Sequence, residues 1–298
     1  ANVVILGPAY PLRGGGMSTF NERLARAFMD EGHQTTIFTF SLQYPGFLFP
    51  GKTQYSDEEA PKGLDIRVRV NSVNPLNWIR TAREISRMRP DLLVIRYWLP
   101  FMAPCLGTIA RIVRKNKLTR IVGITDNVIP HEKRVGDRLL TRYFLRPVHA
   151  FVTLSESVRK DLKGFGIEEG RISHCYHPLY DNFGPAVSRK EARQKLGLDQ
   201  EEPLVLFFGF IRDYKGLDLL MQAFACNELK EKPVKLLVAG EFYEKPGLYE
   251  RLEKQLVLQD RIYWHTRFIP NHMVRYYFCA ADIVAQPYKN ATQSGVTQ

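Results

Sequence analysis

The sequence predicts an α/β protein made of two doubly wound parallel sheets, and three observations predict it. Apolar strand-like runs alternate with amphipathic helical patterns along the whole chain, which is typical of parallel strands joined by right-handed crossovers. The alternation breaks once, at 177–188 (HPLYDNFGPAVS), where prolines and a glycine interrupt both periodicities. A chain of 298 residues is also long enough to bury two cores. We therefore predict one domain over residues 1–180 and a second over residues 181–298.

The first half contains six strand candidates and four helix candidates. Each strand candidate is a short apolar or alternating run, and the helix candidates repeat apolar residues at helical spacing. The expected strands are 3–6, 35–40, 65–70, 92–96, 120–125 and 151–155, and the expected helices are Ser18–Glu31, Asn77–Arg89, Leu106–Lys117 and Glu156–Phe165.

The second half restarts the alternation, with strands expected at 204–208, 234–240, 261–265 and 282–286 and a helix after each of the first three. The apolar residues of 217–224 follow the spacing of one helix face. Four strands are few for a doubly wound domain, and no closing helix pattern follows the last one. The sequence therefore predicts a C-terminal domain that is cut short.

The composition excludes several classes of protein. Hydrophobic residues make up 45% of the chain and charged residues 24%, as in soluble globular proteins. The uncharged stretch 97–110 is too short for a transmembrane helix and contains two prolines, and no signal-peptide pattern opens the chain. The four cysteines are scattered without a Cys-x-x-Cys pair, which argues against a disulfide framework or a zinc site. These features predict a cytoplasmic protein.

The net charge of +11 is concentrated in residues 1–180, which carry 26 Lys+Arg and 16 Asp+Glu. This one-sided field predicts a nucleic acid, an anionic membrane surface or an acidic substrate as partner, unless the charge only maintains solubility. In the 107–117 segment, Arg111, Arg114 and Lys115 lie opposite the apolar side, which suits either a solvated helix back or a helix on anionic lipid. Aromatic residues interleaved with Lys and Arg are not evident, which disfavours nucleic acid.

Three loops of the first half are expected to line one crevice, because open α/β sheets bind ligands at the carboxyl ends of their strands. The first loop contains Gly14, Gly15 and Gly16, whose backbone can approach an anion closely. Their spacing fits neither a dinucleotide fingerprint nor a Walker P-loop, and a plain surface loop is the alternative. The second loop begins after Arg96, at the end of the fourth strand.

The third loop, in ITDNVIPHEKR, carries the titratable residues best placed for work on a substrate. Asp126, His131 and Glu132 could exchange protons with a substrate or position it, and Asn127 stands beside them. Taken singly, each of these residues has a structural alternative, such as a turn or a helix cap.

The stretch LFFGFIRDYKGLDLL, at 206–220, places Arg212 and Lys215 between a buried strand and the start of a helix. Free N–H groups and the helix dipole favour anions at such a position. The two cations therefore predict a phosphate site, with simple solvation as the alternative.

Several stretches together resemble the group 1 (family 4) retaining glycosyltransferases, which use nucleotide-diphosphate sugars and have the GT-B fold. The resembling stretches cover nearly the whole chain in the family's order: GGG, DNVIPHEKR, FVTLSESVRKDL, HPLY, FFGFIRDYKGLDLLMQAF, LLVAGEFY and AADIVAQPYKNATQSGV. The resemblance implies two Rossmann-like domains that face each other across a cleft. The first would bind the acceptor and the second, here incomplete, the donor.

The resemblance also implies roles for individual residues. Lys215 falls on the family's lysine that holds the donor diphosphate, and Arg212 would supply the family's arginine from a shifted position, because Phe210 stands where that arginine usually is. The donor-binding positions are then Gly14, Gly15, Gly16, Arg212, Lys215, Glu241, Phe268, Thr292, Ser294, Gly295 and Val296. The catalytic positions are Asp126, His131, Arg212 and Lys215, and the acceptor-side positions are Arg96, Asn127 and Glu132.

Two positions depart from the family pattern. Asp126 stands where the family often has a histidine that contacts the transferred sugar. Thr292 stands at the first of two glutamates separated by seven residues, and the second would lie beyond Gln298.

The implied reaction transfers a hexose, with retention, to a glycan or lipid-linked acceptor of cell-envelope polysaccharide synthesis. Preorganised cations and N–H groups would stabilise the leaving diphosphate, at roughly 3–4 kcal/mol per donor. No metal or cofactor is expected, and no Asp-x-Asp pair suits one. The basic first half predicts a peripheral protein on the inner face of the cytoplasmic membrane. A nucleotide-sugar epimerase and a non-catalytic nucleotide-sugar-binding protein are the alternatives on this fold, and a nucleic-acid-binding protein is a weaker one.

Overall fold

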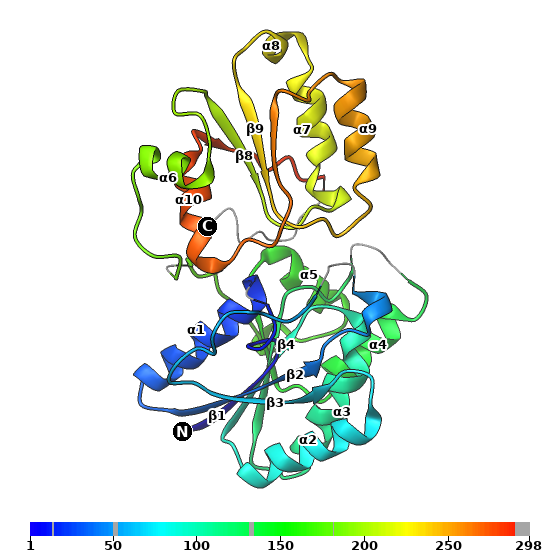
Figure 1. Ribbon diagram of the computed structural model, residues 1–298. Coiled ribbons are helices and arrows are strands. Elements are labelled where there is room, and N and C mark those ends of the chain that lie inside the picture. Colours follow the sequence, from blue (N-terminus) through cyan, green and yellow to red (C-terminus); the bar gives the residue numbers. More distant parts are fainter. Residues whose placement is uncertain (14, 50–52, 131–133, 181, 290–298) are drawn as a thin grey trace. The chain divides into compact units, whose positions relative to one another are not determined.

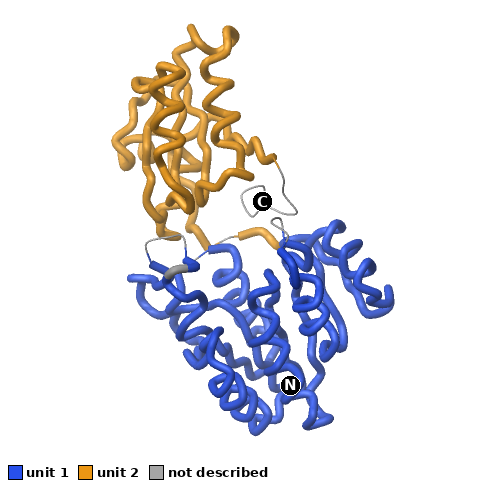
Figure 2. Tube along the Cα trace, turned by 90° about the vertical axis from the view of Figure 1, so that its right-hand side faces the viewer, with its two compact units in different colours: residues 1–177 blue, residues 178–298 orange. Residues whose placement is uncertain are grey.

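The computed structural model of the chain divides into two compact units, residues 1–177 (unit 1) and residues 178–298 (unit 2), which Figure 2 distinguishes by colour. It describes all residues except 14, 50–52, 131–133, 181 and 290–298. Each unit is built around a parallel sheet with helices on both faces (Figure 1). The division falls within the 177–188 stretch, where the sequence loses its periodicity.

Unit 1 contains a seven-stranded parallel sheet. Its strands are β1 (Asn2–Leu6), β2 (Gln34–Leu42), β3 (Asp65–Asn71), β4 (Leu92–Tyr97), β5 (Arg120–Thr125), β6 (Ala150–Thr153) and β7 (Ile172–His174). Their spatial order is β3-β2-β1-β4-β5-β6-β7, so the chain winds outward from β1 in one direction and from β4 in the other. The reversal between β1 and β4 is the topological switch point, where doubly wound folds bind their ligands.

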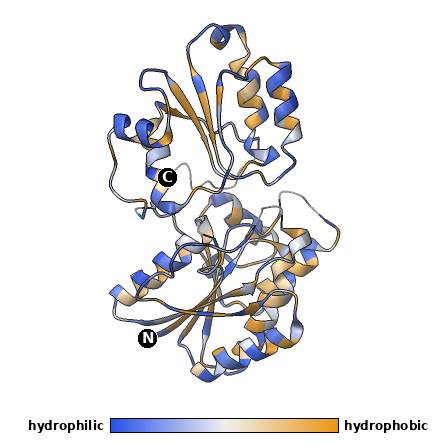
Figure 3. Cartoon of the chain, viewed as in Figure 1, coloured by the Kyte–Doolittle hydropathy of each residue, from blue (hydrophilic) through white to orange (hydrophobic). Residues whose placement is uncertain are grey.

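In the described part of unit 1, the α-helices that pack on the sheet are α1 (Gly16–Asp30), α2 (Pro75–Met88), α3 (Ala103–Arg114), α4 (Asp137–Leu145) and α5 (Glu156–Gly164). Successive side chains of a strand point to opposite faces. Val3 and Ile5 of β1 therefore pack with α1, while Val4 and Leu6 belong to the core that α2 to α5 cover. Figure 3 shows the same division, with hydrophobic residues concentrated on the strands and hydrophilic residues on the outer sides of the helices.

Unit 2 contains a four-stranded parallel sheet in the order β10-β9-β8-β11. The strands are β8 (Leu204–Phe208), β9 (Lys235–Ala239), β10 (Ile262–His265) and β11 (Ile283–Val284), and the helices are α6 (Arg189–Leu196), α7 (Leu217–Phe224), α8 (Asn227–Lys230), α9 (Gly247–Gln255) and α10 (Asn271–Ala280). Helices α7 and α9 cover one face and α6 and α10 the other (Figure 1). The switch point of this sheet lies between β8 and β11.

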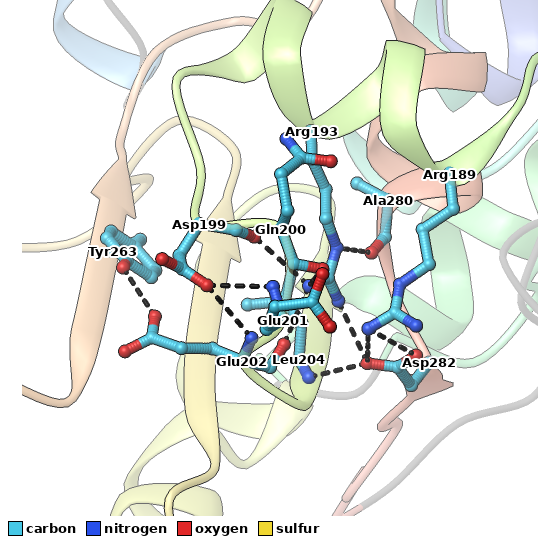
Figure 4. A network of polar contacts seen from close by, with 10 residues as sticks. All are labelled: Arg189, Arg193, Asp199, Gln200, Glu201, Glu202, Leu204, Tyr263, Ala280 and Asp282. Atoms are coloured by element: carbon cyan, nitrogen blue, oxygen red, sulfur yellow. Dashed lines mark hydrogen bonds and ion pairs between the residues drawn. The ribbon is translucent and has the colours of Figure 1, made fainter.

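A buried arginine network holds the amino end of the unit 2 sheet together (Figure 4). Arg193 of α6 is fully buried, and its guanidinium donates to carbonyl oxygens of the 199–202 turn and of Ala280 in α10. It also donates to Asp282 at 3.0 Å, and Asp282 accepts the backbone N–H of Leu204, where β8 begins, at 2.7 Å. Because these contacts lie at the amino end of the strands, they stabilise the fold and leave the carboxyl end for ligands.

The predicted α/β class with two doubly wound sheets is confirmed, and all ten expected strands are present. Elements that were not predicted include β7, α4 and α6. The helix expected over Leu106–Lys117 instead spans Ala103–Arg114, and Lys117 follows it with a left-handed φ of 57°. Among the described residues, no helix has both the length and the apolar character needed to cross a membrane.

Candidate functional site

The described site residues lie at the carboxyl edges of the two sheets, and each unit is considered by itself. In unit 1, the loop after β1, the end of β4 and the loop after β5 are neighbours, because these three strands are adjacent. In unit 2, the loop after β8 and the segment after β11 are neighbours for the same reason. Both sets of residues therefore lie at or beside a topological switch point, and their position at the carboxyl ends of strands agrees with the sequence prediction.

Buried polar side chains fix the loop between β1 and α1. Asn21 donates to the carbonyl oxygen of Pro8 at 2.8 Å. The Thr39 hydroxyl accepts the Ala9 N–H at 2.9 Å and donates to the Ala9 carbonyl at 3.1 Å. Gly15 is the N-cap of α1, where no side chain caps the helix and no acidic residue stands in its first turn, so the positive end of the helix dipole meets this loop.

Arg96 and Asp126 form a buried ion pair beside that loop. Arg96 Nε donates to Asp126 Oδ2 at 2.6 Å and Nη2 donates to Oδ1 at 2.5 Å, while the two residues are 2% and 5% exposed. The guanidinium carbon lies 4.1 Å from the centre of the Phe20 ring. This bidentate geometry holds the Asp126 carboxylate as an oriented anion.

Strand register explains why these residues meet. Arg96 of β4 lies opposite Ile124 of β5, so Asp126 follows two residues beyond that pair. The structure thus brings together one predicted acceptor-side residue and one predicted catalytic residue. Asn127 follows in a half-buried position. The predicted residues His131 and Glu132, like Gly14, lie outside the described residues.

Lys215 is the most distinctive residue of the unit 2 edge. It ends the 3-10 helix η4 (Asp213–Lys215) and is only 9% exposed. Among the described residues, no carboxylate lies within ion-pair distance of Lys215, whose Nζ is 5.7 Å from the centre of the Tyr288 ring. Burial, and then the charge of Arg212, lowers the pKa of Lys215 from 10.5 to about 8.

Two glycines permit the close packing of the backbone and side chains around this lysine. Gly209 has φ of 104°, and a Cβ on it would lie 2.6 Å from Lys215 Nζ. Gly216 has φ of 70°, and a Cβ on it would lie 2.0 Å from the carbonyl oxygen of Pro287, in the segment after β11. Both positions therefore require glycine, for backbone conformation and for space.

Arg212 is exposed and lies against an aromatic pair. The Phe210 and Tyr243 rings stack with their centres 4.1 Å apart, and the Arg212 guanidinium carbon is 4.9 Å from the centre of the Tyr243 ring. Arg212 is close enough to Lys215 for its charge to lower the pKa of that lysine. The two predicted cations thus belong to one positive site at the end of β8.

Of the other predicted donor-side residues, some lie at the carboxyl edge of the unit 2 sheet and the rest fall outside the described residues. Glu241 follows β9 and is buried, and its carbonyl oxygen accepts the Ile211 N–H at 2.9 Å. Phe268 follows β10 in a half-buried position. The remaining four predicted residues, Thr292, Ser294, Gly295 and Val296, lie outside the described residues.

Comparison with known proteins places this geometry in a family. Residues 15–174 match the family described as "Glycosyl transferase 4-like domain", and residues 188–293 match "Glycosyl transferases group 1". The chain belongs to the group 1 glycosyltransferases. It is 34% identical to D-inositol 3-phosphate glycosyltransferase of Xylanimonas cellulosilytica, over 93% of this chain and 70% of that protein. It is 29% identical to alpha-monoglucosyldiacylglycerol synthase of Streptococcus pneumoniae, over 52% of this chain and 36% of that protein.

Solved structures identify the fold of this glycosyltransferase as GT-B. HepE of Anabaena, in complex with UDP and glucose, superposes with a TM-score of 0.72 at 14% identity, over 99% of this chain and 76% of that chain. The lipopolysaccharide glycosyltransferase WaaG superposes with a TM-score of 0.68 at 18% identity, over 99% of this chain and 77% of that chain. The predicted family and fold are therefore confirmed.

Several residues that build the two edges were not predicted from the sequence. Asn21 and Thr39 anchor the β1–α1 loop, Tyr243 lies beside Arg212, and Tyr288 lies near Lys215. The Gly-Phe-Ile-Arg sequence after β8 led to the prediction of Arg212 but carries no sign of Tyr243. These contacts join loops of different strands, and no local pattern signals them.

Proposed function

We propose that the protein is a retaining glycosyltransferase that transfers a hexose from a nucleotide-diphosphate sugar to a membrane-associated glycan or a lipid-linked acceptor. Its place would be the synthesis of a cell-envelope polysaccharide. Unit 2 would bind the donor and unit 1 the acceptor. The structures of HepE with UDP and with UDP-glucose support a donor of this class.

The observation that carries the proposal is the buried cation at the end of β8. Burying a charge without a partner is costly, and a protein keeps such a group chiefly where a ligand supplies the countercharge. Lys215 is 9% exposed, and Arg212, whose charge lowers the pKa of Lys215, carries the same sign. A diphosphate would supply the countercharge for both residues.

In the proposed reaction, the bond between the anomeric carbon and the diphosphate oxygen breaks, and both electrons leave with the diphosphate. Lys215 and Arg212 stabilise the negative charge that develops on the leaving oxygen, and the Gly14–Gly16 loop of unit 1 contributes N–H groups. The acceptor oxygen bonds to the anomeric carbon on the face that the diphosphate leaves, and its proton passes to the departing phosphate. The protein cations supply the positive charge of this mechanism, so we propose no metal or cofactor.

On the acceptor side, we propose that Asp126 orients a hydroxyl group. Arg96 donates to both carboxylate oxygens of Asp126, which fixes the direction of that side chain. A carboxylate held in one direction is suited to accept a hydrogen bond from a sugar hydroxyl. Asn127, His131 and Glu132 complete the proposed acceptor side.

We also propose peripheral attachment to the inner face of the cytoplasmic membrane, through α3 and α4. Side-chain ion pairs neutralise the cations of neighbouring elements, as between Arg67 and Glu84 or between Lys163 and Glu169. Among the described residues, no carboxylate pairs with the cations of α3, of α4, of the turns after these helices and of the first position of β5, which are Arg111, Arg114, Lys115, Lys117, Arg120, Arg138, Arg142 and Arg146. Burial and then Arg114, Arg120 and Arg171 lower the pKa of His149 beside them, as expected of a positive field. Exposed Leu118 and Leu139 supply apolar contacts.

Substitution of Lys215 tests the proposed reaction. The sugar nucleotide is first chosen as the one among UDP-, GDP- and ADP-sugars that raises the melting temperature most. In the complete gene product, Lys215→Ala should lower turnover at least a hundredfold, consistent with the roughly 3–4 kcal/mol that one leaving-group donor contributes. The matched control is Lys235→Ala, which removes a lysine from the start of β9 and should stay within twofold of wild type. Near-normal turnover of Lys215→Ala would rule out the assigned role.

A further inference from the structure

Two carboxylates flank Lys215 in the sequence but do not pair with it. Asp213 belongs to the same 3-10 helix, and Asp218 stands in the first turn of α7. Both contact Lys289 instead: its Nζ lies 2.7 Å from Asp213 Oδ1 and 2.9 Å from Asp218 Oδ2. Lys289 therefore forms ion pairs with both of the carboxylates that are closest in sequence to the buried Lys215.

The backbone holds Lys289 beside this loop. Its backbone N–H donates to the carbonyl oxygen of Tyr214 at 2.8 Å. Tyr214 lies between Asp213 and Lys215 in the sequence. Two residues earlier, Pro287 approaches Gly216 so closely that a Cβ on the glycine would lie 2.0 Å from the proline oxygen. The segment after β11 thus lies against the loop after β8, and the Lys289 side chain is held next to the acidic residues.

Asp218 depends on Lys289 for its countercharge. Its Oδ2 is the atom that Lys289 contacts, while its Oδ1 is buried and has no hydrogen-bond partner among the residues the structure describes. The pKa of Lys289 is raised, first by its hydrogen bonds to Asp213 and then by those to Asp218, so this cation stays protonated across the neutral range. If Lys289 were neutral, the loop would hold two uncompensated carboxylates.

We propose that Lys289 is a positioning residue that keeps Lys215 free for an anionic ligand by holding Asp213 and Asp218 in ion pairs of its own. Without Lys289, the two carboxylates would attract Lys215 and repel a diphosphate. This inference rests on the proposed function, in which Lys215 binds the diphosphate of the donor. It adds a second lysine that acts through charge balance, without contact to the ligand.

The experiment measures binding of a nucleoside diphosphate by isothermal titration calorimetry between pH 6.5 and pH 9.5. UDP, ADP and GDP are compared by thermal shift, and the one that stabilises the wild type most is used. We expect Lys289→Met to weaken binding at pH 7 about tenfold or more, and Lys289→Arg to stay within about threefold of wild type. In Lys289→Met, the loss of affinity with rising pH should also move to higher pH, because two unpaired carboxylates favour protonated Lys215.

A rescue variant separates charge balance from folding. Combining Lys289→Met with Asp213→Asn and Asp218→Asn removes the competing carboxylates together with their partner. We expect this triple variant to recover most of the wild-type affinity, although it lacks the same ion pairs. The matched control is Lys235→Met, whose lysine pairs with Glu202 at 3.3 Å at the other end of the sheet and should leave binding unchanged.

Lys215→Met distinguishes failure of this inference from failure of the proposed function. If Lys215→Met binds the diphosphate as tightly as the wild type, the proposed function is wrong and Lys289 has no cation to protect. If Lys215→Met loses binding while Lys289→Met keeps it, only the role of Lys289 is wrong. The same conclusion follows if Lys289→Met loses binding and the triple variant fails to recover it, because Lys289 would then act through structure.

Discussion

Each unit places a buried cation at the carboxyl edge of its parallel sheet, but the two cations have opposite surroundings. In unit 1, Arg96 is 2% exposed and forms a bidentate pair with buried Asp126. In unit 2, Lys215 is 9% exposed and, within the described part of the chain, no carboxylate pairs with it. The first cation has its countercharge within the fold, whereas the second is left for a ligand to neutralise.

This difference distinguishes a residue that stabilises the structure of a site from a residue that binds the ligand there. A buried ion pair holds its members in place, and breaking it leaves an uncompensated charge that destabilises the fold. An unpaired buried lysine destabilises the free protein, which is reflected in its lowered pKa, and gains its partner only on binding. Arg96 and Lys215 both lie at the carboxyl edge of a doubly wound sheet, so their position does not distinguish their roles. The presence or absence of a carboxylate partner does.

The largest expected effect is on the stability of unit 1. Arg96→Met should lower its free energy of unfolding by about 3–5 kcal/mol, because Asp126 would remain buried without its partner. The double variant Arg96→Met/Asp126→Leu should be clearly more stable than Arg96→Met, because it removes both charges. Denaturant unfolding of the variants checks this. A loss below about 1 kcal/mol in Arg96→Met would contradict the structural role of the pair.

Surface cations extend the same comparison. Replacing Lys115, Lys117 and Arg142, which have no carboxylate partner among the described residues, by Gln should weaken binding to anionic vesicles by roughly 3 kcal/mol, or about a hundredfold. The control replaces Arg67, Arg69 and Arg159, which pair with carboxylates, by Gln and changes the net charge equally.

Co-sedimentation with phosphatidylglycerol and phosphatidylcholine vesicles at low salt measures both variants. The control should bind the anionic vesicles more tightly than the first variant. Equal binding of the wild type to both kinds of vesicle would remove the membrane proposal.

A smaller effect of opposite sign is expected for Lys215. Its pKa is lowered from 10.5 to about 8, and one pKa unit corresponds to about 1.4 kcal/mol. Lys215→Met should therefore stabilise the free protein at pH 7 by about 1–3 kcal/mol while it abolishes transfer activity. Thermal unfolding without ligand measures the gain, and destabilisation would show that the lysine has a partner in the fold.

The pH dependence of stability follows from the same shift. Between pH 8 and pH 10.5 the unfolded chain binds the Lys215 proton more tightly than the folded chain does, so this residue makes the free energy of unfolding rise with pH across that window. Lys215→Met should remove this rise. Urea titrations of wild type and variant at pH 7.5 and pH 10 compare the two slopes directly.

The sequence predicts the architecture and the positions of the site residues better than it predicts the contacts between their side chains. Alternating strand and helix patterns predict both sheets, and strand ends locate Arg96, Asp126 and Lys215 at carboxyl edges. The helix α6 could also have been predicted from the sequence, because Ser188 and Glu191 form a Ser-x-x-Glu capping pattern in which the Ser188 side chain accepts the N–H of Glu191.

Pairings between distant segments could not be predicted. The Arg96–Asp126 pair depends on the adjacency and register of β4 and β5, which no local pattern encodes. Lys289 contacts Asp213 across 76 residues of sequence, and a lysine that follows a strand is usually a solvated surface residue. Whether a buried cation is paired is a property of the fold, and this property distinguishes the two units.

The most direct test of the account is the uptake of protons when a nucleoside diphosphate binds at pH 8. Titration calorimetry in two buffers of different ionisation enthalpy gives the number of protons taken up. With a pKa of about 8, Lys215 is roughly half protonated in the free protein, and a bound diphosphate should protonate it fully. The account predicts uptake of about half a proton in the wild type, whereas Lys215→Met should lose binding and, with it, the proton uptake. Tight binding without proton uptake, or equal uptake by the variant, would contradict it.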